Sequence, residues 1–269
     1  MASNDSTESH DCGAPDTIAA RIAHTLRTGA GSLLDFVYPP HCAVCRAPVD
    51  SVDRPLCSSC CDEIVRPPAN RCPRCSCPRN HPSPGDGGSC PNDCPQCGNW
   101  PPEIERALVL GPFAGVLREA VHAIKFADHR RLAVELGRRL AVLPEFEQFD
   151  RIDLLVPVPL HPARQRERGF NQSLLIARGI AEASGKPVLT DRVRRVKATR
   201  QQAMLTAAQR ASNLAFAFAA SPLPAGVVAG LVDDVITTGS TVGACAEPLA
   251  ARGGSVVVLA LANAPVQEA

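Results

Sequence analysis

The sequence has few aromatic residues, no long apolar run and almost no net charge. Its 269 residues include eight Phe, one Tyr and one Trp, which leaves no obvious group of rings on which a flat ligand could stack. No stretch approaches the roughly 20 consecutive apolar residues of a membrane span, so we do not expect an integral membrane protein. The first thirty residues lack a basic start followed by an apolar run, which argues against a secretory signal and favours the cytoplasm.

Cysteine is abundant, and it is confined to one part of the chain. Eleven of the thirteen cysteines lie within residues 42–97. This part is rich in proline and poor in apolar runs, so it needs a cross-link in place of a core of its own. We therefore predict three parts: a disordered or short-helical segment over 1–32, a cysteine module over 33–102, and a larger domain over 103–265.

The module contains four Cys-x-x-Cys pairs, each of which can bring two thiolates to one tetrahedral metal. The pairs are Cys42 and Cys45, Cys57 and Cys60, Cys72 and Cys75, and Cys94 and Cys97. Four pairs make two sites, and a four-thiolate site leaves no open position for water, so we predict two structural zinc ions. Pairing in sequence order joins the first two pairs and the last two, although a crossed pairing fits the spacing as well.

The spacing leaves further alternatives open. A disulfide framework would use the same residues, but it requires an oxidising compartment that the N-terminal sequence does not indicate. Five cysteines are surplus, and two of them, Cys61 and Cys90, lie near predicted ligands and are alternative candidates. We expect Cys12 and Cys245 to be ordinary thiols, and Cys77 has no assigned role.

Beyond residue 103, short β-rich runs alternate with helical patterns. Several of the strands are apolar on both faces, as parallel strands covered by helices are. The predicted strands cover residues 107–111, 152–157, 227–232 and 255–262, with a short strand opening at Val188. The predicted helices cover residues 114–126, 131–143, 171–183, 206–213 and 241–251. The pattern predicts an α/β domain with a mainly parallel sheet flanked by helices.

An acidic pair, Asp233 and Asp234, follows the apolar strand 227–232 and precedes a hydroxyl-rich turn. The turn carries Thr237, Thr238, Gly239, Ser240 and Thr241. It offers backbone N–H groups, hydroxyls and the positive end of a helix dipole to a phosphate, while the carboxylates lie where they can hold a sugar diol. Taken singly, an Asp pair is usually a solvated turn and a Thr-Thr-Gly run a helix cap, but their order after a buried strand indicates a phosphate site.

Positive charge is concentrated in the middle of the domain. Residues 153–213 hold eleven Lys and Arg against four Asp and Glu, a net charge of +7, whereas the whole chain has +1. The run after the second strand includes Pro159, Arg164 and Arg168, and arginine forks suit the oxygens of a dense anion such as pyrophosphate. The alternative to an anion site is that these arginines are simply exposed on a proline-punctuated loop. Lys125 ends a predicted helix and is a further candidate, although a lysine there also compensates the helix dipole.

These motifs resemble those of a known family. Residues 228–242 resemble the 5-phosphoribosyl-1-pyrophosphate (PRPP) motif of type I phosphoribosyltransferases. The run Val-Pro-Val-Pro-Leu-His from Val156 resembles the ComF family, whose members join an N-terminal double zinc ribbon to a phosphoribosyltransferase-like domain and are linked to DNA uptake. The resemblance covers residues 33–262. It includes the pair Lys125-Phe126 and the residues around Arg200, which resemble the family's mobile segment over the active site.

The resemblance implies that the domain binds PRPP together with Mg²⁺. Asp233 and Asp234 are then implied to contact the ribose hydroxyls, and residues 237–241 to clasp the 5-phosphate. Catalysis by positioning and electrostatics falls to the two carboxylates and to Arg200. The remaining residues implied for the PRPP site are Pro159, Arg164, Arg168 and Lys125.

The acceptor of a transferred phosphoribosyl group is not evident from the residues. Three functions of different classes remain: a phosphoribosyltransferase acting on an unknown nucleobase-like acceptor, in nucleotide salvage or DNA uptake; a PRPP- or nucleotide-binding protein without turnover; and a factor that handles single-stranded DNA. Pyrophosphate release with a panel of bases separates the first two. Steeply salt-dependent oligonucleotide binding favours the third.

Overall fold

The structure is a computed structural model of the chain. It describes residues 39–51, 53–64, 71–78, 94, 96–196 and 217–264. The chain divides into two compact units, Met1–Pro40 and His41–Ala269, and all that follows concerns the second unit. The short helices predicted within 1–32, the helix predicted over 206–213, and Arg200 lie outside the described residues. Among the described residues, no helix has both the length and the apolar character needed to cross a bilayer.

Four parallel strands form the central sheet. They are β1 (Ile104–Pro112), β2 (Leu154–Pro157), β5 (Val228–Ile236) and β6 (Ser255–Asn263), in the spatial order β1-β6-β5-β2. All three pairings are parallel, so the four strands end at one edge of the sheet, which is where open parallel sheets bind their ligands. The predicted α/β fold with a mainly parallel sheet is confirmed.

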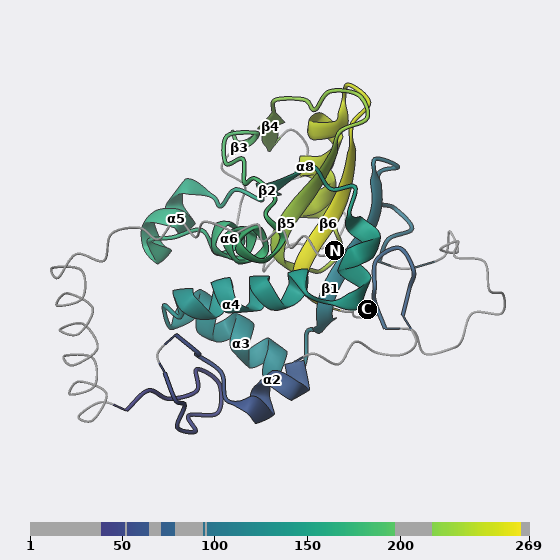
Figure 1. The fold of residues 1–269 in the computed structure, drawn as a ribbon. Coiled ribbons are helices and arrows are strands. Elements are labelled where there is room, and N and C mark those ends of the chain that lie inside the picture. The colour runs from purple at the N-terminus through teal and green to yellow at the C-terminus, as the bar shows by residue number, and fades with distance from the viewer. Residues whose placement is uncertain are drawn as a thin grey trace, which may run out of the picture. The chain divides into compact units, whose positions relative to one another are not determined.

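Helices cover both faces of this sheet (Figure 1). Three helices, α3 (Gly115–Phe126), α4 (Arg130–Ala141) and α6 (Gln172–Ser184), pack on one face, and α8 (Ser240–Ala250) packs on the other. Strand side chains alternate between the two faces, with Val257 of β6 facing α4 and α6 and its neighbour Val258 facing α8. The shorter elements are α2 (Ser58–Ile64), the 3-10 helix η1 (Pro144–Phe149), α5 (Pro162–Arg168) and the antiparallel strands β3 (Val193–Arg195) and β4 (Phe218–Ala220).

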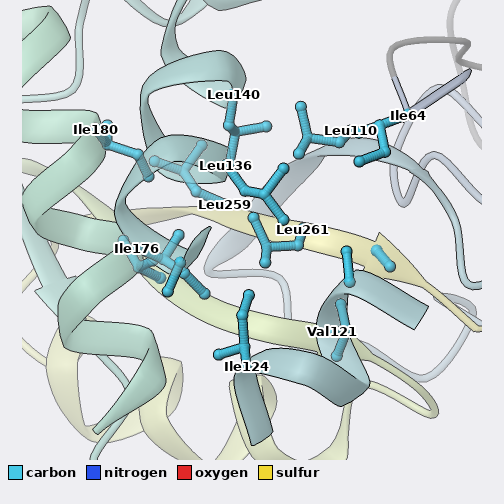
Figure 2. Close-up of a cluster of buried hydrophobic side chains, with 14 of the residues drawn as sticks. Ile64, Leu110, Val121, Ile124, Leu136, Leu140, Ile176, Ile180, Leu259 and Leu261 are labelled. Atoms are coloured by element: carbon cyan, nitrogen blue, oxygen red, sulfur yellow. The ribbon is translucent and has the colours of Figure 1, made fainter. Parts of the chain in front are cut away.

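The larger core lies beneath α3, α4 and α6. Figure 2 shows aliphatic side chains from these helices meeting Leu259 and Leu261 of β6, and both leucines are completely buried. The crossing of α4 and α6 is close, because a Cβ at Gly137 would lie 2.2 Å from the carbonyl oxygen of Ile176. A side chain at this position would force the two helices apart, so a glycine is needed there.

Three elements differ from the sequence-based prediction. Residues 162–168 form helix α5, whereas the sequence allowed a proline-punctuated loop there. Pro162 occupies the first turn of the helix, where its missing N–H costs nothing. The side chain of His161 caps the helix by accepting a hydrogen bond from the N–H of Ala163. The strands β3 and β4 were not predicted as a pair, because three residues are too few to show a periodic pattern. Val188 makes only an isolated parallel bridge to Leu155.

Candidate functional site

The eight predicted ligands gather into two clusters. The first cluster is Cys42, Cys45, Cys57 and Cys60, and the second cluster is Cys72, Cys75, Cys94 and Cys97; within each, all four sulfur atoms lie within 4.8 Å of one another. The pairing follows the order of the sequence.

The sulfur spacing fits a tetrahedral metal. Tetrahedral zinc with bonds of about 2.3 Å places its sulfur ligands about 3.8 Å apart. The Sγ–Sγ distance is 3.5 Å for Cys45 and Cys57 and 3.7 Å for Cys72 and Cys97, both well beyond the roughly 2.05 Å of a disulfide bond. Two four-cysteine clusters of this kind fit a double zinc ribbon.

The surplus cysteines take different positions. Cys61 follows the first cluster in sequence but contributes no sulfur to it. The Sγ of Cys77 lies 3.7 Å from that of Cys94, beside the second cluster. Cys245 is completely buried on α8, where burial raises the pKa of its thiol well above the usual range. Cys12 and Cys90 lie outside the described residues.

A large pocket of about 1080 Å³ opens at the carboxyl edge of the sheet. Its lining includes the ends of β2 and β5, helix α5, and the end of α3. The predicted site residues that line it are Lys125, Pro159, Arg164, Arg168, Asp233, Asp234, Thr237 and Thr241. Residues from three separate parts of the sequence are thus brought to one cavity, whereas the predicted residues Thr238, Gly239 and Ser240 are not part of its lining.

Asp233 and Asp234 lie near the end of β5 and are both buried. Their partners come from the first turn of α6, where the hydroxyl of Ser173 donates to Asp233 Oδ1 at 3.1 Å and the amide of Gln172 donates to Asp234 Oδ2 at 2.9 Å. Lys125 Nζ forms an ion pair with Asp234 Oδ2 at 2.9 Å. The carboxylates are therefore held in fixed positions, which is what the recognition of a diol or a cation requires.

The two carboxyl groups do not share one environment. Burial, and then the neighbouring Asp234 carboxylate, raise the pKa of Asp233 to about 7, while the backbone N–H of Asp234, the Lys125 ammonium and the Ser173 hydroxyl act to lower it. Asp233 therefore exchanges its proton near neutral pH, and a bound cation would displace that proton.

The predicted phosphate loop joins β5 to α8. Gly239 is the N-cap of α8, with φ of +78°, and it provides no side-chain cap for the first N–H groups of the helix. The hydroxyls of Thr238 and Ser240 lie 2.7 Å apart and hydrogen-bond each other. These N–H groups and hydroxyls form a suitable site for an anion.

The second cluster contacts this loop directly. Gln96, the residue before the ligand Cys97, donates from Nε2 to the carbonyl oxygen of Thr237 and lies 3.4 Å from that of Ile236. Trp100 packs on the turn so closely that a Cβ at Gly239 would lie 1.9 Å from Trp100 Nε1. The second cluster and the phosphate loop therefore form one packed unit.

Arginines provide the positive charge of the pocket. Arg168 donates to Gln172 Oε1 at 2.8 Å, and burial lowers its pKa although the nearby Asp234 carboxylate acts to raise it. Burial, and then the neighbouring Arg164, lower the pKa of Arg195. The cost of gathering these cations is recovered when an anion binds among them.

Several lining residues were not singled out from the sequence. Arg130 stands over the Phe170 ring at 4.8 Å, and Arg195 comes from the short strand β3. One sequence signal could have identified Gln172 and Ser173. Asn171 is a helix N-cap, so the two residues that follow it lie in the first turn of a helix. Gln96 had no such signal, because a residue inside a Cys-x-x-Cys turn is read only as a spacer.

Comparison with known proteins gives consistent relatives over most of the chain. DNA utilization protein YhgH of Salmonella typhi is 34% identical over 225 residues, which is 81% of this chain and 94% of the relative. Competence protein F of Haemophilus influenzae is 31% identical over 208 residues, 74% of this chain and 86% of the relative. Competence protein ComFC of Bacillus subtilis is 24% identical over 212 residues, covering 77% and 82%. No protein-family model matches the chain.

Proposed function

Because the chain belongs to the family of DNA utilization protein YhgH and competence protein F, the ComF family, we propose that its pocket is a PRPP site and that it acts as a phosphoribosyltransferase. The observation that carries the proposal is that the buried pair Asp233 and Asp234, the loop residues Thr237 and Thr241, and a group of cations line the same cavity. A ribose that bears a 5-phosphate and a 1-pyrophosphate needs these three kinds of group in one place.

Each part of the ligand has a matching part of the pocket. The 5-phosphate binds the N–H groups and hydroxyls of residues 237–241, and the ribose hydroxyls donate to Asp233 and Asp234. The pyrophosphate lies against Arg164 and Arg168, and Lys125 compensates the charge of Asp234 until the ligand arrives. Asp233 and Asp234 are the carboxylates that would hold a Mg²⁺ bound together with PRPP, and the ion would neutralise part of the pyrophosphate charge.

The reaction needs no protein nucleophile. The bond between C1 of the ribose and the pyrophosphate oxygen breaks, and its electron pair leaves with pyrophosphate. A nitrogen of the acceptor forms the new bond to C1, and its proton passes to the released pyrophosphate. The carboxylates stabilise positive charge on the ribose, and the arginines stabilise negative charge on the leaving group. Arg200, the third residue predicted to take part in catalysis, lies outside the described residues.

The names of the relatives support a biological setting in DNA utilization or competence. We propose that the protein handles nucleotides or bases derived from acquired DNA, in the cytoplasm, where its clustered thiols stay reduced. There are two alternatives. The protein binds PRPP or a nucleotide without turnover, or it binds single-stranded DNA through the cationic pocket. Pyrophosphate release with a panel of bases separates transfer from binding.

Calorimetry with PRPP and Mg²⁺ tests the proposed site. We expect wild-type protein to bind and the combined variant Asp233→Asn with Asp234→Asn to lose binding, because an amide cannot replace the charge that a cation and a ribose need. Asn keeps acceptors for Ser173 and Gln172, so the fold is retained, which thermal unfolding checks. Glu119→Gln, on the exposed side of α3, is the control. Unchanged affinity in the double variant contradicts the assignment.

The pKa of Asp233 adds a pH dependence to the same measurement. Below pH 7 Asp233 holds a proton that Mg-PRPP displaces, so the affinity rises as the pH rises from 6 to 8 and binding at pH 6.5 releases a proton. Without ligand the sign is opposite, because the folded state keeps this proton between about pH 4 and 7 while the unfolded state has lost it, so the free energy of unfolding falls as pH rises across that range. The variant Asp233→Asn should remove both effects.

A further inference from the structure

We propose that the ring of Phe126, positioned by Arg168, forms a stacking site for a nucleobase at the mouth of the pocket. The inference rests on the proposed function, because it names the class of acceptor or product that the same pocket takes. Phe126 is 76% exposed although it lines the pocket. The other large hydrophobic side chains exposed among the described residues, Val142 and Val196, are aliphatic and do not line it.

The Phe126 ring is positioned by its neighbours. The guanidinium carbon of Arg168 lies 5.8 Å from the ring centroid, and the His122 ring meets it edge-on with an interplanar angle of 83°. Single exposed hydrophobic residues are common and need no explanation. This one differs because it combines an open aromatic face with a guanidinium at the wall of a cavity, an arrangement that binds flat π-systems.

Two sets of contacts connect the Phe126 ring to Asp234, the carboxylate proposed to bind the ribose. Lys125, the preceding residue, forms the ion pair with Asp234. Arg168 donates to Gln172 at 2.8 Å, and Gln172 in turn donates to the same carboxylate at 2.9 Å. The Phe126 ring and the Asp234 carboxylate are thus held close together. A base attached to C1 of a ribose at Asp234 therefore lies within reach of Phe126.

The charge of the pocket indicates which class of flat ligand can bind there. Cationic side chains line it at Lys125, Arg130, Arg164, Arg168 and Arg195, and acidic ones at Asp128, Glu167, Asp233 and Asp234. Lys125 and Arg130 form ion pairs with Asp234 and Asp128, so Arg164, Arg168 and Arg195 are the cations that an anionic ligand would meet. A neutral aromatic or a lipid chain gains nothing from these groups, whereas a nucleotide has both an anionic phosphate and a π-face. Because aromatic stacking tolerates any base, the site selects the class of ligand, a nucleotide, more than one particular base.

The test compares a ligand that has a base with one that lacks it. Calorimetry should show that uridine 5′-monophosphate binds wild-type protein about tenfold more tightly than ribose 5-phosphate. In Phe126→Ala the two ligands should bind equally, because the stacking is lost while ribose 5-phosphate keeps its affinity. Phe126→Trp should restore the preference. Val142→Ala, at the end of α4 and 70% exposed, is the matched control and should behave as wild type.

The outcomes separate this inference from the proposed function. Equal affinity of the two ligands for wild-type protein, or a preference that survives Phe126→Ala, overturns the stacking site while leaving the PRPP site intact. Failure of both PRPP and ribose 5-phosphate to bind overturns the proposed function and the stacking site with it. Because Phe126 is exposed, its substitution leaves the core unchanged, and equal thermal midpoints of the variants verify this.

Discussion

The two cysteine clusters share one set of ligands but have different relations to the rest of the molecule. In the first cluster Cys45 is exposed and Cys57 is half-buried, whereas all four cysteines of the second cluster are buried. The buried thiols of the first cluster join the core beneath α3, α4 and α6, while the second cluster joins the core beneath α8. The first and second clusters therefore attach to opposite faces of one sheet.

The third residue of each Cys-x-x-Cys turn also differs between the two clusters. In the second cluster these residues are Arg74 and Gln96, which are long and polar. Arg74 donates to the carbonyl oxygens of Cys97 at 3.1 Å and Pro101 at 3.0 Å, and Gln96 donates to the phosphate loop. In the first cluster Val44 has no side-chain donor and Ser59 is exposed. We infer that the first cluster stabilises the helical face and that the second also shapes the site.

The largest effect should come from removing a ligand of the second cluster. Cys97→Ser should lower the free energy of unfolding by at least about 5 kcal/mol and abolish PRPP binding, because a buried metal site and the loop that packs on it are lost together. Cys45→Ser, at an exposed ligand, should leave PRPP binding measurable. Thermal unfolding, zinc content and calorimetry on both variants check this, and equal losses in the two variants would remove the distinction between the clusters.

Removal of metal should proceed in two steps. We expect freshly purified protein to contain two zinc ions per chain, and a chelator to take the first cluster's ion earlier because its thiolates are accessible. PRPP affinity should survive the first step and disappear in the second. By linkage, bound PRPP should tighten zinc binding at the second cluster only, so that the second step needs a higher chelator concentration. A chromogenic chelator follows release over time, and simultaneous loss of both ions, or no effect of PRPP, contradicts the coupling.

The next effect concerns the contact between Trp100 and the loop. Gly239→Ala should cost about 3 kcal/mol of stability, because the new Cβ meets Trp100 and the backbone has a positive φ. Gly226→Ala is the matched control: its φ is +80° but no atom lies within 4 Å of the added Cβ, so only about 1 kcal/mol is expected. Chemical denaturation of both variants measures the difference, and equal costs would mean that the Trp100 contact is unimportant.

The smallest effect should come from Gln96. Gln96→Leu should weaken PRPP binding about tenfold, or about 1.4 kcal/mol, because the carbonyl oxygens of the loop lose their donor. Its zinc content should stay at two ions. Ser59→Leu introduces the same side chain at the equivalent exposed turn of the first cluster and should leave the affinity unchanged. A wild-type affinity for Gln96→Leu would show that the second cluster does not position the loop.

Much of the architecture follows from local patterns in the sequence. Strands such as 255–262 are apolar on both faces, and helix 114–126 is clearly amphipathic, so the sheet and its main helices were predictable within a few residues. The pairing of cysteines in sequence order was one of two predicted arrangements. The Asp233–Asp234 doublet and its loop could be recognised because strand, turn and helix follow one another without interruption.

What the sequence does not reveal depends on contacts between distant segments. Gln96 and Thr237 are 141 positions apart, and a polar residue in a tight turn has no local signal of its partner. Phe126 is the last residue of α3, two positions after the buried Ile124, and its place at the pocket is visible only once α5 places Arg168 beside it. Helix α5 was uncertain because its prolines and arginines are equally typical of a loop.

The most direct test of the central claim is an experimental structure of the protein with PRPP and Mg²⁺. The account predicts the 5-phosphate within hydrogen-bond distance of the N–H groups of residues 238–241, with the ribose hydroxyls at Asp233 and Asp234. Phosphate bound elsewhere on the molecule, or a ribose that faces away from the two carboxylates, would contradict it.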